Sequence, residues 1–482
     1  MFLSLVGYIN LYWVYVVLFW LYVITTIGTI GVILSENRSP VKSLAWVTVL
    51  LLLPVLGLVL YLFFGRSIKN TRMISRRNRR KLRRRESFKK VKFDRLGLSK
   101  ESLQQIQLSR TLNGAIYYPG NTTRVFTNGQ DKFDALKRDL KSASKFINMQ
   151  YYIVTDDKIG CQIKDILVEK ARAGVTVRLI YDHVGSFGTK GSFFKELKQA
   201  GVQAYPFFRV AFPPFGTRIN WRNHRKICII DGRVGYIGGM NIADRYIDGG
   251  KAFKTWRDTH IRVEGPAVGG LQFSFIVDWN FMGQPLIEDS VNAQEAEVCG
   301  IDGMQLLTSG PTSQWTNIAM LFIKAIANSK RRVFLQTPYF LPTEGLLKAL
   351  QTAALSGVDV RVMIPRRSDS RMLDAASHSY VVECLQSGVK MYLYEAGMLH
   401  AKTMVVDDEF VSIGSTNFDF RSFEHNFEAN MQIYSTAVND EMAKIFQQDL
   451  QQSTRLYLSE WKKRPIAKKA GESIVRLLSP IL

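Results

Sequence analysis

The chain has 482 residues, more than the roughly 250 to 300 at which a single hydrophobic core stops growing, so two or three folded units are expected. Its composition is that of an ordinary folded protein, apart from a formal net charge of +23. Four scattered cysteines without CxxC spacing argue against a zinc site or a disulfide scaffold and favour reduced thiols on a cytosolic face. These cysteines are Cys161, Cys228, Cys299 and Cys384.

The N-terminal 65 residues predict a membrane hairpin. No charged residue occurs from Met1 to Leu34, and the stretch 12–34 is long enough to cross roughly 30 Å of hydrocarbon. After a short polar connector, the uncharged stretch 44–65 is again long enough. A cleaved signal peptide is the alternative, but the first stretch lacks a basic leader, is too long, and is followed by a second span.

A basic segment over 66–109 follows the hairpin and predicts its orientation. Between Arg66 and Arg95 there are fifteen Lys or Arg against two acidic residues, so this stretch carries +13 of the net +23. Basic flanks stay cytoplasmic, which places both termini inside and the connector outside. A solvated linker, a nucleic-acid patch and a contact with anionic lipid all remain open. The lipid contact is favoured, at about 1 kcal/mol per basic residue near a membrane surface.

The region from about 110 to 482 contains an internal repeat. "AGVTVRLIYD" corresponds to "SGVDVRVMIP", and "LKQAGVQAYPF" corresponds to "LQSGVKMYLYE". In each copy, helical segments end on glycine and lead into β-branched strands, which is typical of βα units and a largely parallel sheet. The sequence therefore predicts two similar α/β domains, 110–300 and 301–482.

The most informative repeat is "HRKICIIDGRVGYIGGMN", which corresponds to "HAKTMVVDDEFVSIGSTN" 176 residues later. A histidine and a lysine two residues apart on a strand point to the same face, and an aspartate follows the lysine by five residues at a turn. The two sets are His224, Lys226 and Asp231, and His400, Lys402 and Asp407.

Small residues and an asparagine return beside each histidine on the second strand of the hairpin. They leave room for a tetrahedral group and supply an amide to hydrogen-bond it. These residues are Gly238, Gly239 and Asn241 in the first copy and Gly414, Ser415 and Asn417 in the second. Two such faces together would suit a phosphodiester, with one histidine attacking phosphorus and the other protonating the leaving alkoxide.

Two carboxylates at matching places in the repeats, Asp258 and Glu428, are candidates for orienting the histidines. An edge carboxylate in water is an alternative, and for Asp258 it is equally well supported. The remaining histidines lack the His-x-Lys spacing and are interpreted as structural or peripheral. They are His183, His260, His378 and His425.

The pattern H-x-K-x4-D followed by G-[GS]-x-N, present twice, resembles the phospholipase D superfamily. The hairpin with its "ENRSPVKSLAWVTVLLLLPVLGLVLYLFFGRS", the "INWRNHRK" before the first motif and the "RLLSPIL" ending are similar to bacterial cardiolipin synthases. The resemblance implies two like α/β/α domains in a pseudo-twofold arrangement and a phosphohistidine intermediate, without a metal or other cofactor. It also implies His224 as nucleophile and His400 as general acid and then base.

The reaction implied by this resemblance is phosphatidyl transfer between two phosphatidylglycerol molecules, giving cardiolipin and glycerol. The implied setting is a bacterial plasma membrane, with a multi-pass anchor, cytoplasmic catalytic domains, phosphatidylglycerol and other anionic phospholipids as partners, and no nucleic acid. A phospholipase D hydrolase, transfer to another alcohol, a nucleic-acid enzyme and an inactive scaffold remain as alternatives.

Two further segments carry predictions about lipid. The stretch 205–222, rich in Phe, Pro and Arg, is interpreted as a lipid-facing lip or as a buried linker between the repeats. The C-terminal "WKKRPIAKKAGESIVRLLSPIL" mixes basic and aliphatic residues as an interfacial helix does, and an ordinary packing helix is the alternative.

Overall fold

The computed structural model describes residues 2–35, 40–53, 55–65, 69, 72–85, 97–209, 220–287 and 297–479. The chain divides into two compact units. One comprises Met1–Ile68 and Val210–Asn220, and the other comprises Lys69–Arg209 and Trp221–Leu482. Most of the predicted lipid-facing lip, 210–219, lies outside the described residues.

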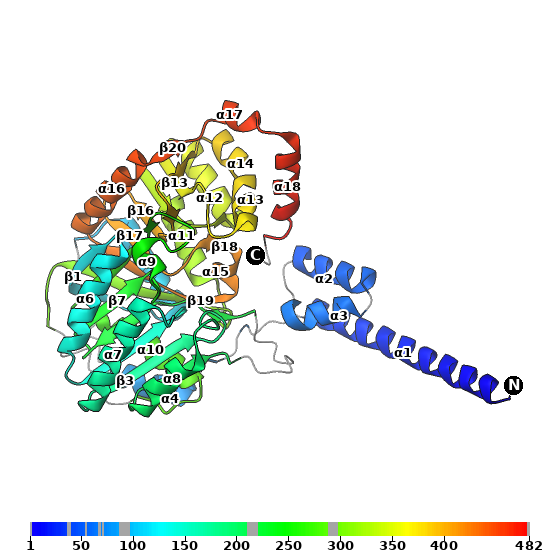
Figure 1. The fold of residues 1–482 in the computed structure, drawn as a ribbon. Helices are drawn as coiled ribbons and strands as arrows, with labels where there is room; N and C mark the ends of the chain where they lie inside the picture. Colours follow the sequence, from blue (N-terminus) through cyan, green and yellow to red (C-terminus); the bar gives the residue numbers. More distant parts are fainter. Residues whose placement is uncertain are drawn as a thin grey trace. The chain divides into compact units, whose positions relative to one another are not determined.

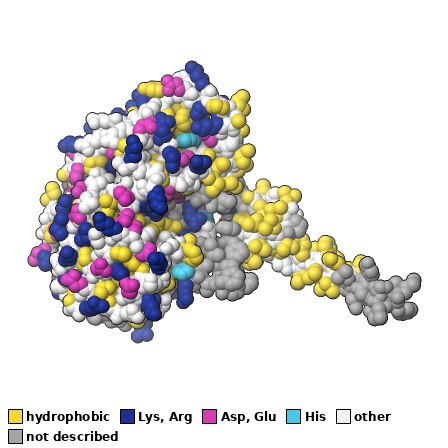
Figure 2. All heavy atoms as spheres, in the orientation of Figure 1, with side chains coloured by type: hydrophobic (Ala, Val, Ile, Leu, Met, Phe, Trp, Pro, Cys, Tyr) yellow, Lys and Arg dark blue, Asp and Glu magenta, His cyan; other side chains and the backbone are white. Residues whose placement is uncertain are grey.

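The N-terminal unit contains α1 (Phe2–Ser35), α2 (Pro40–Leu52), α3 (Leu56–Leu60) and a π-helical turn η1 (Tyr61–Gly65). Within the described residues, one helical stretch is long and apolar enough to cross a membrane, Tyr12–Ser35 with a mean hydropathy of 2.2. Its large apolar side chains are exposed, and Figure 2 shows the apolar surface along this unit. At 1.5 Å per residue the 13-residue α2 is about 20 Å long, shorter than the roughly 30 Å hydrocarbon core.

The second predicted span is therefore not one straight helix. The hydroxyl of Tyr22 in α1 donates to the Leu50 carbonyl of α2 at 3.0 Å, so these two helices pack together. A Cβ placed on Gly57 of α3 would lie 2.7 Å from the Val49 carbonyl oxygen, which shows how tightly α3 folds back onto α2 (Figure 1). Crossing of the membrane by 44–65 stays a prediction.

The larger unit is built on one mixed sheet with two similar halves. They meet where β1 (Tyr117–Phe126) pairs antiparallel with β10 (Asp302–Ser309). Outward from β1 the strands are β9 (His260–Glu264), β7 (Val234–Gly238), β6 (Ile227–Ile230), β2 (Phe146–Tyr151), β3 (Thr176–Asp182) and β4 (Gln203–Phe207). Outward from β10 they are β19 (Asn426–Tyr434), β17 (Phe410–Gly414), β16 (Thr403–Val406), β11 (Arg332–Gln336), β13 (Asp359–Pro365), β14 (Lys390–Tyr394) and β20 (Ser453–Arg455).

The sheet is less parallel than the sequence suggested. Along this order of strands, pairing is parallel from β2 through β3 to β4 and from β11 through β13 to β14, and it is antiparallel between the other neighbours. The difference arises at the repeated motifs, because β6–β7 and β16–β17 are hairpins joined by short turns. Only antiparallel strands can be joined in that way.

Helices cover both faces of the sheet, which gives the predicted α/β/α layering (Figure 1). One layer holds α6 (Gly129–Ser142), α7 (Lys158–Arg172) and α8 (Gly191–Gln199), with α11 (Asn317–Ala327), α12 (Glu344–Leu355) and α14 (Val381–Gln386) in the second half. The other layer holds α10 (Val268–Phe281) and α16 (Thr436–Gln451). On β2, Met149 packs in the core beneath α6 and α7, whereas the neighbouring Asn148 bonds Gln272 of α10 at 3.1 Å.

Part of the segment assigned to the linker belongs to the folded unit. Helix α5 (Lys100–Asn113) places Ile106, 1% exposed, in the core of the second half. The side chain of Gln305 on β10 donates to the Ile106 carbonyl at 3.1 Å. Residues 100–109 are therefore packed against the second repeat rather than acting as a spacer.

Candidate active site

Each repeated motif lies on a hairpin whose turn is fixed by its aspartate. Asp231 and Asp407 have positive φ angles of 52° and 48°, and both carboxylates accept backbone N–H bonds from the start of the neighbouring strand. The Asp231 carboxylate accepts from Ser144, Lys145 and Phe146 at 2.7 to 2.8 Å. The structure thus places both aspartates at the turns and does not bring them to the histidines.

The two histidines are anchored by strands of the opposite repeat. β5 (Arg222–Asn223) pairs in parallel with β19, and the His224 N–H donates to the Phe427 carbonyl at 2.9 Å. In the same way β15 (Met398–Leu399) pairs with β8 (Trp256–Arg257), and the His400 N–H donates to the Arg257 carbonyl at 2.7 Å. These short parallel pairs carry each histidine across the boundary between the repeats.

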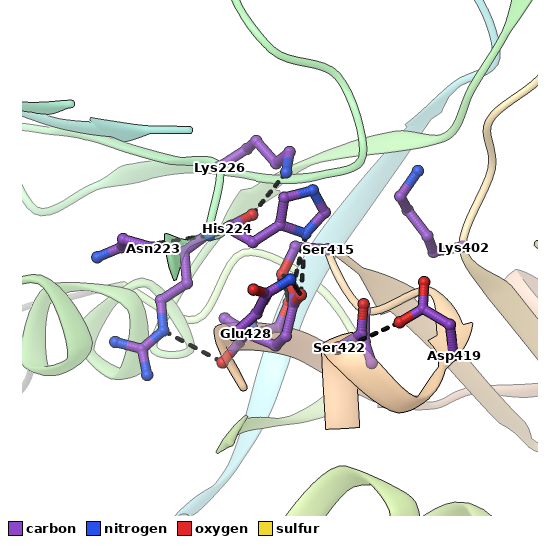
Figure 3. A network of polar contacts seen from close by, with 12 residues as sticks. Asn223, His224, Lys226, Lys402, Ser415, Asp419, Ser422 and Glu428 are labelled. Carbon is purple, nitrogen blue, oxygen red and sulfur yellow. Dashed lines mark hydrogen bonds and ion pairs between the residues drawn. The ribbon is translucent and has the colours of Figure 1, made fainter. Parts of the chain in front are cut away.

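This crossing brings each histidine to the carboxylate of the other repeat. Nδ1 of His224 lies 2.9 Å and 3.1 Å from the two carboxylate oxygens of Glu428 (Figure 3). Nδ1 of His400 lies 2.6 Å from Oδ2 of Asp258. Both carboxylates are fully buried. With Nδ1–H donating to a carboxylate, Nε2 is left with the lone pair that can attack or accept a proton.

Both lysines lie beside the histidines. Nζ of Lys226 donates to the His224 carbonyl at 2.6 Å, and Nζ of Lys402 lies 2.8 Å from Nδ1 of His400. Because a lysine ammonium can only donate whereas the Asp258 carboxylate accepts, we assign the hydrogen bond from Nδ1–H of His400 to Asp258. Figure 3 shows that the edge of the His224 ring that faces away from Glu428 lies on the side of the two lysine amines.

Burial sets the charge of the site without substrate. It lowers the pKa of His224 to about 4 and holds the pKa of His400 well below its usual range. Burial also lowers the pKa of Lys402 to about 8 and raises that of Asp258 to about 6. At neutral pH the site therefore presents neutral imidazoles beside a lysine ammonium. An arriving phosphodiester anion would favour protonation of one imidazole, as acid–base catalysis requires.

The matching positions Gly239 and Ser415 both contact the orienting carboxylates, but differently. The Ser415 hydroxyl donates to Glu428. A Cβ on Gly239 would lie only 2.1 Å from Oδ1 of Asp258. Glycine is therefore required in the first repeat, because any side chain there would displace the carboxylate that holds His400.

This contact predicts that Gly239→Ala lowers turnover of a generic phosphodiester such as bis-p-nitrophenyl phosphate by about 100-fold, since small displacements of catalytic groups cost about that much. The matched variant Ser415→Ala removes one hydrogen bond and should cost about tenfold or less. Steady-state rates, together with thermal unfolding of both variants, make the comparison. Equal losses would contradict the steric role of this position.

The two asparagines differ in what they bind. Oδ1 of Asn241 accepts from the Ile153 N–H at 3.1 Å, and Nδ2 donates to the Tyr246 hydroxyl at 2.5 Å, so its amide holds the chain. Asn417 is 6% exposed, and its Oδ1 has no partner among the described residues. The amide of Asn417 is thus the one of the pair with an end available to a ligand.

Sequence reasoning missed a buried polar layer behind the histidines. Asp278 of α10 bonds Gln150 and Arg225, each at 2.5 Å, and Asp449 of α16 bonds Gln336 at 2.7 Å and Arg257. Arg225 directly follows His224, and Arg257 directly precedes Asp258. Their bonds hold these two segments of chain against α10 and α16. One signal was available, because Asp278 is the only charge in the segment 268–281.

Aromatic rings and the remaining histidines complete the surroundings. The Tyr152 ring lies 5.0 Å from the His224 ring, and the Trp256 ring lies 5.3 Å from that of His400. By contrast, the His378 ring meets the Trp461 ring edge-to-face near the C-terminus, with the ring centroids 5.4 Å apart. Among the described residues, no cluster of three or more His, Cys, Asp or Glu is arranged to hold a metal ion.

Sequence comparison finds the same kind of protein along nearly the whole chain. The family described as "Cardiolipin synthase, PLD-like domain" matches 136–251 and 322–450, and "Phospholipase_D-nuclease N-terminal" matches 13–66. "Cardiolipin synthase 2" of Bacillus anthracis is 42% identical, covering 94% of this chain and 89% of the relative. "Major cardiolipin synthase ClsA" of Bacillus subtilis (strain 168) is 40% identical, covering 94% and 96%.

Solved structures share the fold at low identity. The phosphatidylserine synthase of Haemophilus influenzae Rd KW20 superposes with a TM-score of 0.60 at 14% identity, covering 79% of this chain and all of that one. The polyphosphate kinase of Porphyromonas gingivalis gives a TM-score of 0.50 at 13% identity, covering 74% and 52%. These similarities confirm the predicted architecture of two like α/β domains.

Proposed function

Because the chain belongs to the cardiolipin synthase family of the phospholipase D superfamily, we propose that it transfers a phosphatidyl group between two phosphatidylglycerol molecules. The products are cardiolipin and glycerol. The observation that carries the proposal is the pair of crossed contacts, His224 with Glu428 and His400 with Asp258, beside two buried lysines.

In the first step, Nε2 of His224 attacks the phosphorus of one phosphatidylglycerol. The bond from phosphorus to the glycerol oxygen breaks, and protonated His400 gives its proton to that oxygen, so that glycerol leaves. Lys226 and Lys402 stabilise the charge on the non-bridging oxygens. Glu428 and Asp258 stabilise the imidazolium that forms on each histidine.

In the second step, the neutral His400 takes the proton from a hydroxyl of a second phosphatidylglycerol. The hydroxyl oxygen attacks the phosphohistidine, the bond from phosphorus to nitrogen breaks, and cardiolipin is released. One diester replaces another, so the exchange needs no nucleotide. Asp231 and Asp407 act at a distance in this proposal, by fixing the hairpins that present the histidines.

The test is incubation of the full-length protein in vesicles with phosphatidylglycerol as the lipid substrate and no nucleotide, with lipid products and free glycerol quantified. Cardiolipin with equimolar glycerol, lost in His224→Ala and His400→Ala, is the expected result. Phosphatidic acid as the main product would make the protein a hydrolase and overturn the proposal.

The pKa of Lys402 predicts an alkaline limit to activity. Below about pH 8 the buried amine carries a proton and attracts the phosphodiester, and above that pH it becomes neutral. Because kcat/KM reports ionisations of the free enzyme, loss of the Lys402 proton should add up to tenfold per pH unit above about pH 8 to the fall that the lowered pKa of His400 already causes. Profiles from pH 6 to 10 measure this limb.

Lys402→Arg is the matched control, since a guanidinium stays charged over this pH range. The variant should be slower overall, but its alkaline limb should move to higher pH. An unmoved limb would assign the ionisation to another group.

The membrane arrangement extends the same proposal. We place the protein in the bacterial plasma membrane through the α1 span, with 44–65 as the second segment of a multi-pass anchor and the catalytic unit cytoplasmic. The 24-residue apolar stretch and the basic block after the anchor support this arrangement. Single cysteines introduced at Ser4 and at Lys468 should resist an impermeant maleimide in intact cells, and labelling of either would contradict the orientation.

The C-terminal helix α18 (Ile466–Arg476) supports contact with lipid. Ile466 and Ile474 are 80% and 65% exposed, and Leu477 just beyond the helix is 79% exposed. The opposite side is anchored, because Glu472 is buried and Arg476 at the end of the helix donates to Glu383 of α14 at 2.5 Å. We assign the exposed aliphatic edge to the membrane interface, as its sequence suggested.

A further inference from the structure

A cavity of about 600 Å³ in the larger unit lies apart from the catalytic groups. It forms where the two halves of the sheet meet, between α10 and the residues at the start of α11. This volume is within the roughly 300 to 1,000 Å³ of typical ligand pockets. None of the four motif histidines and lysines lines it. Phe427, which does line it, alternates along β19 with Glu428, so these side chains lie on opposite faces of the sheet.

The charge of the lining suits an anion. Arg72, Arg76 at the start of α4 (Arg76–Arg85) and Arg225 line the cavity, and none of its described lining residues is acidic. The N-terminus of α11 also reaches it through Asn317, and the N-cap Thr316 makes no capping bond with its side chain. Unsatisfied N–H groups and guanidinium groups together attract phosphate.

Two residues that line the cavity carry buried polar atoms without partners in the described part of the chain. Ser274 is 5% exposed and lies on one face of α10 with Gly270, Phe273 and Val277, all of which line the cavity. Its hydroxyl has no hydrogen-bond partner among the described residues, and neither has Oδ1 of Asn317, which is 2% exposed. Unpaired buried polar groups are costly and rare, which points to a polar ligand.

Hydroxyl and amide side chains also line the cavity, among them Thr308, Thr312 and Ser313. Another part of the lining is apolar and comprises Met73, Ile74, Leu112, Ile116, Phe273 and Val277. Cations, hydroxyl groups and apolar side chains in one cavity match an anionic lipid with one acyl chain inserted. We propose that this cavity is a second, non-catalytic binding site for an anionic phospholipid. The choice of ligand rests on the proposed function at a lipid membrane.

The test uses the full-length, delipidated protein in neutral detergent and 1-oleoyl lysophosphatidate as the probe. This probe has one acyl chain and a phosphate monoester, so no diester exchange is involved and binding is read without turnover. Equilibrium binding should saturate at one probe per chain, at least tenfold tighter than 1-oleoyl lysophosphatidylcholine. Inorganic phosphate should compete poorly. Equal competition by phosphate would reduce the site to an anion site and overturn the lipid proposal.

Two variants locate the probe. Ser274→Leu narrows the cavity, and the double variant Arg72→Gln with Arg76→Gln removes two of its three lining cations, so each should weaken binding at least tenfold. The matched control is Arg77→Gln with Arg80→Gln, which removes the same charge from exposed arginines of the same basic segment that do not line the cavity. Unchanged binding in Ser274→Leu would place the probe elsewhere, and equal weakening in the control would indicate non-specific attraction. Either result overturns this site while leaving cardiolipin formation, measured separately, intact.

Discussion

Changing His224 to alanine is expected to lower cardiolipin formation by about 10⁴-fold or more, the scale seen when a catalytic nucleophile is removed. Changing His400 to alanine should lower it by about 10² to 10⁴, the contribution of a general acid and base. Both losses follow from the neutral, carboxylate-bound imidazoles in the buried site. Overall rates alone do not separate the roles, because the two repeats are so similar.

A substrate with an acidic leaving group separates them. Phosphatidyl-p-nitrophenol can lose its phenolate without a proton, so formation of the phosphohistidine no longer needs His400. We expect His400→Ala to release one equivalent of nitrophenol in a burst and to accumulate acid-labile phosphoenzyme, because the second step lacks its base. His224→Ala should show neither.

Stopped-flow absorbance and a radiolabelled phosphatidyl group give the two readouts. The opposite pattern, with a burst in His224→Ala, would exchange the roles of the two histidines. Phosphoenzyme in both variants would contradict a single nucleophile. Thermal unfolding of the two variants serves as the control, since each histidine is buried and also bonds a strand of the other repeat.

Most of the site could be predicted because its chemistry lies in short sequence patterns. His224 and Lys226 are two residues apart, and a spacing of two fixes a common face on an extended chain. The second copy at His400 then predicted a composite site. The seam between the halves follows from the same duplication, since β1 and β10 occupy matching places in the sheet.

What the sequence did not show depends on contacts between distant segments. The pattern gave Asp231 and Asp407 the same weight as the histidines, but φ angles and backbone contacts place them at turns. Their positive φ is tolerated by aspartate, and the carboxylate caps the neighbouring strand. A single sequence has no signal for which distant amides a carboxylate will meet. The same limit hid the contacts of Asp278 and Asp449.

The crossing of the histidine–carboxylate pairs also lay beyond the sequence. Asp258 and Glu428 were recognisable as matched positions, but nothing local says that each serves the opposite repeat. That arrangement is produced by the two-residue strands β5 and β15, which are too short for any periodicity. A shift of either strand would separate a histidine from its carboxylate without changing any motif residue.

The crossing has a kinetic consequence. If Glu428 orients His224, then Glu428→Gln should impair the same step as His224→Ala, although the two residues belong to different repeats. Replacing an orienting carboxylate by its amide removes the charge and favours the wrong tautomer, at a cost of about 10⁴ in a well-studied triad. We expect a loss of about 10³ to 10⁴ in cardiolipin formation for Glu428→Gln and for Asp258→Asn.

The activated substrate again distinguishes the variants. Asp258→Asn should retain the nitrophenol burst, because it weakens only the acid and base His400. Glu428→Gln should lose the burst, because it weakens the nucleophile. If instead each carboxylate served its own repeat, Asp258→Asn would lose the burst and Glu428→Gln would keep it.

Since Ser415 and Asn426 also donate to Glu428, the variant Ser415→Ala should show a small loss in the same step. A burst of normal rate in both carboxylate variants would show that orientation by these groups contributes little to the attack on phosphorus.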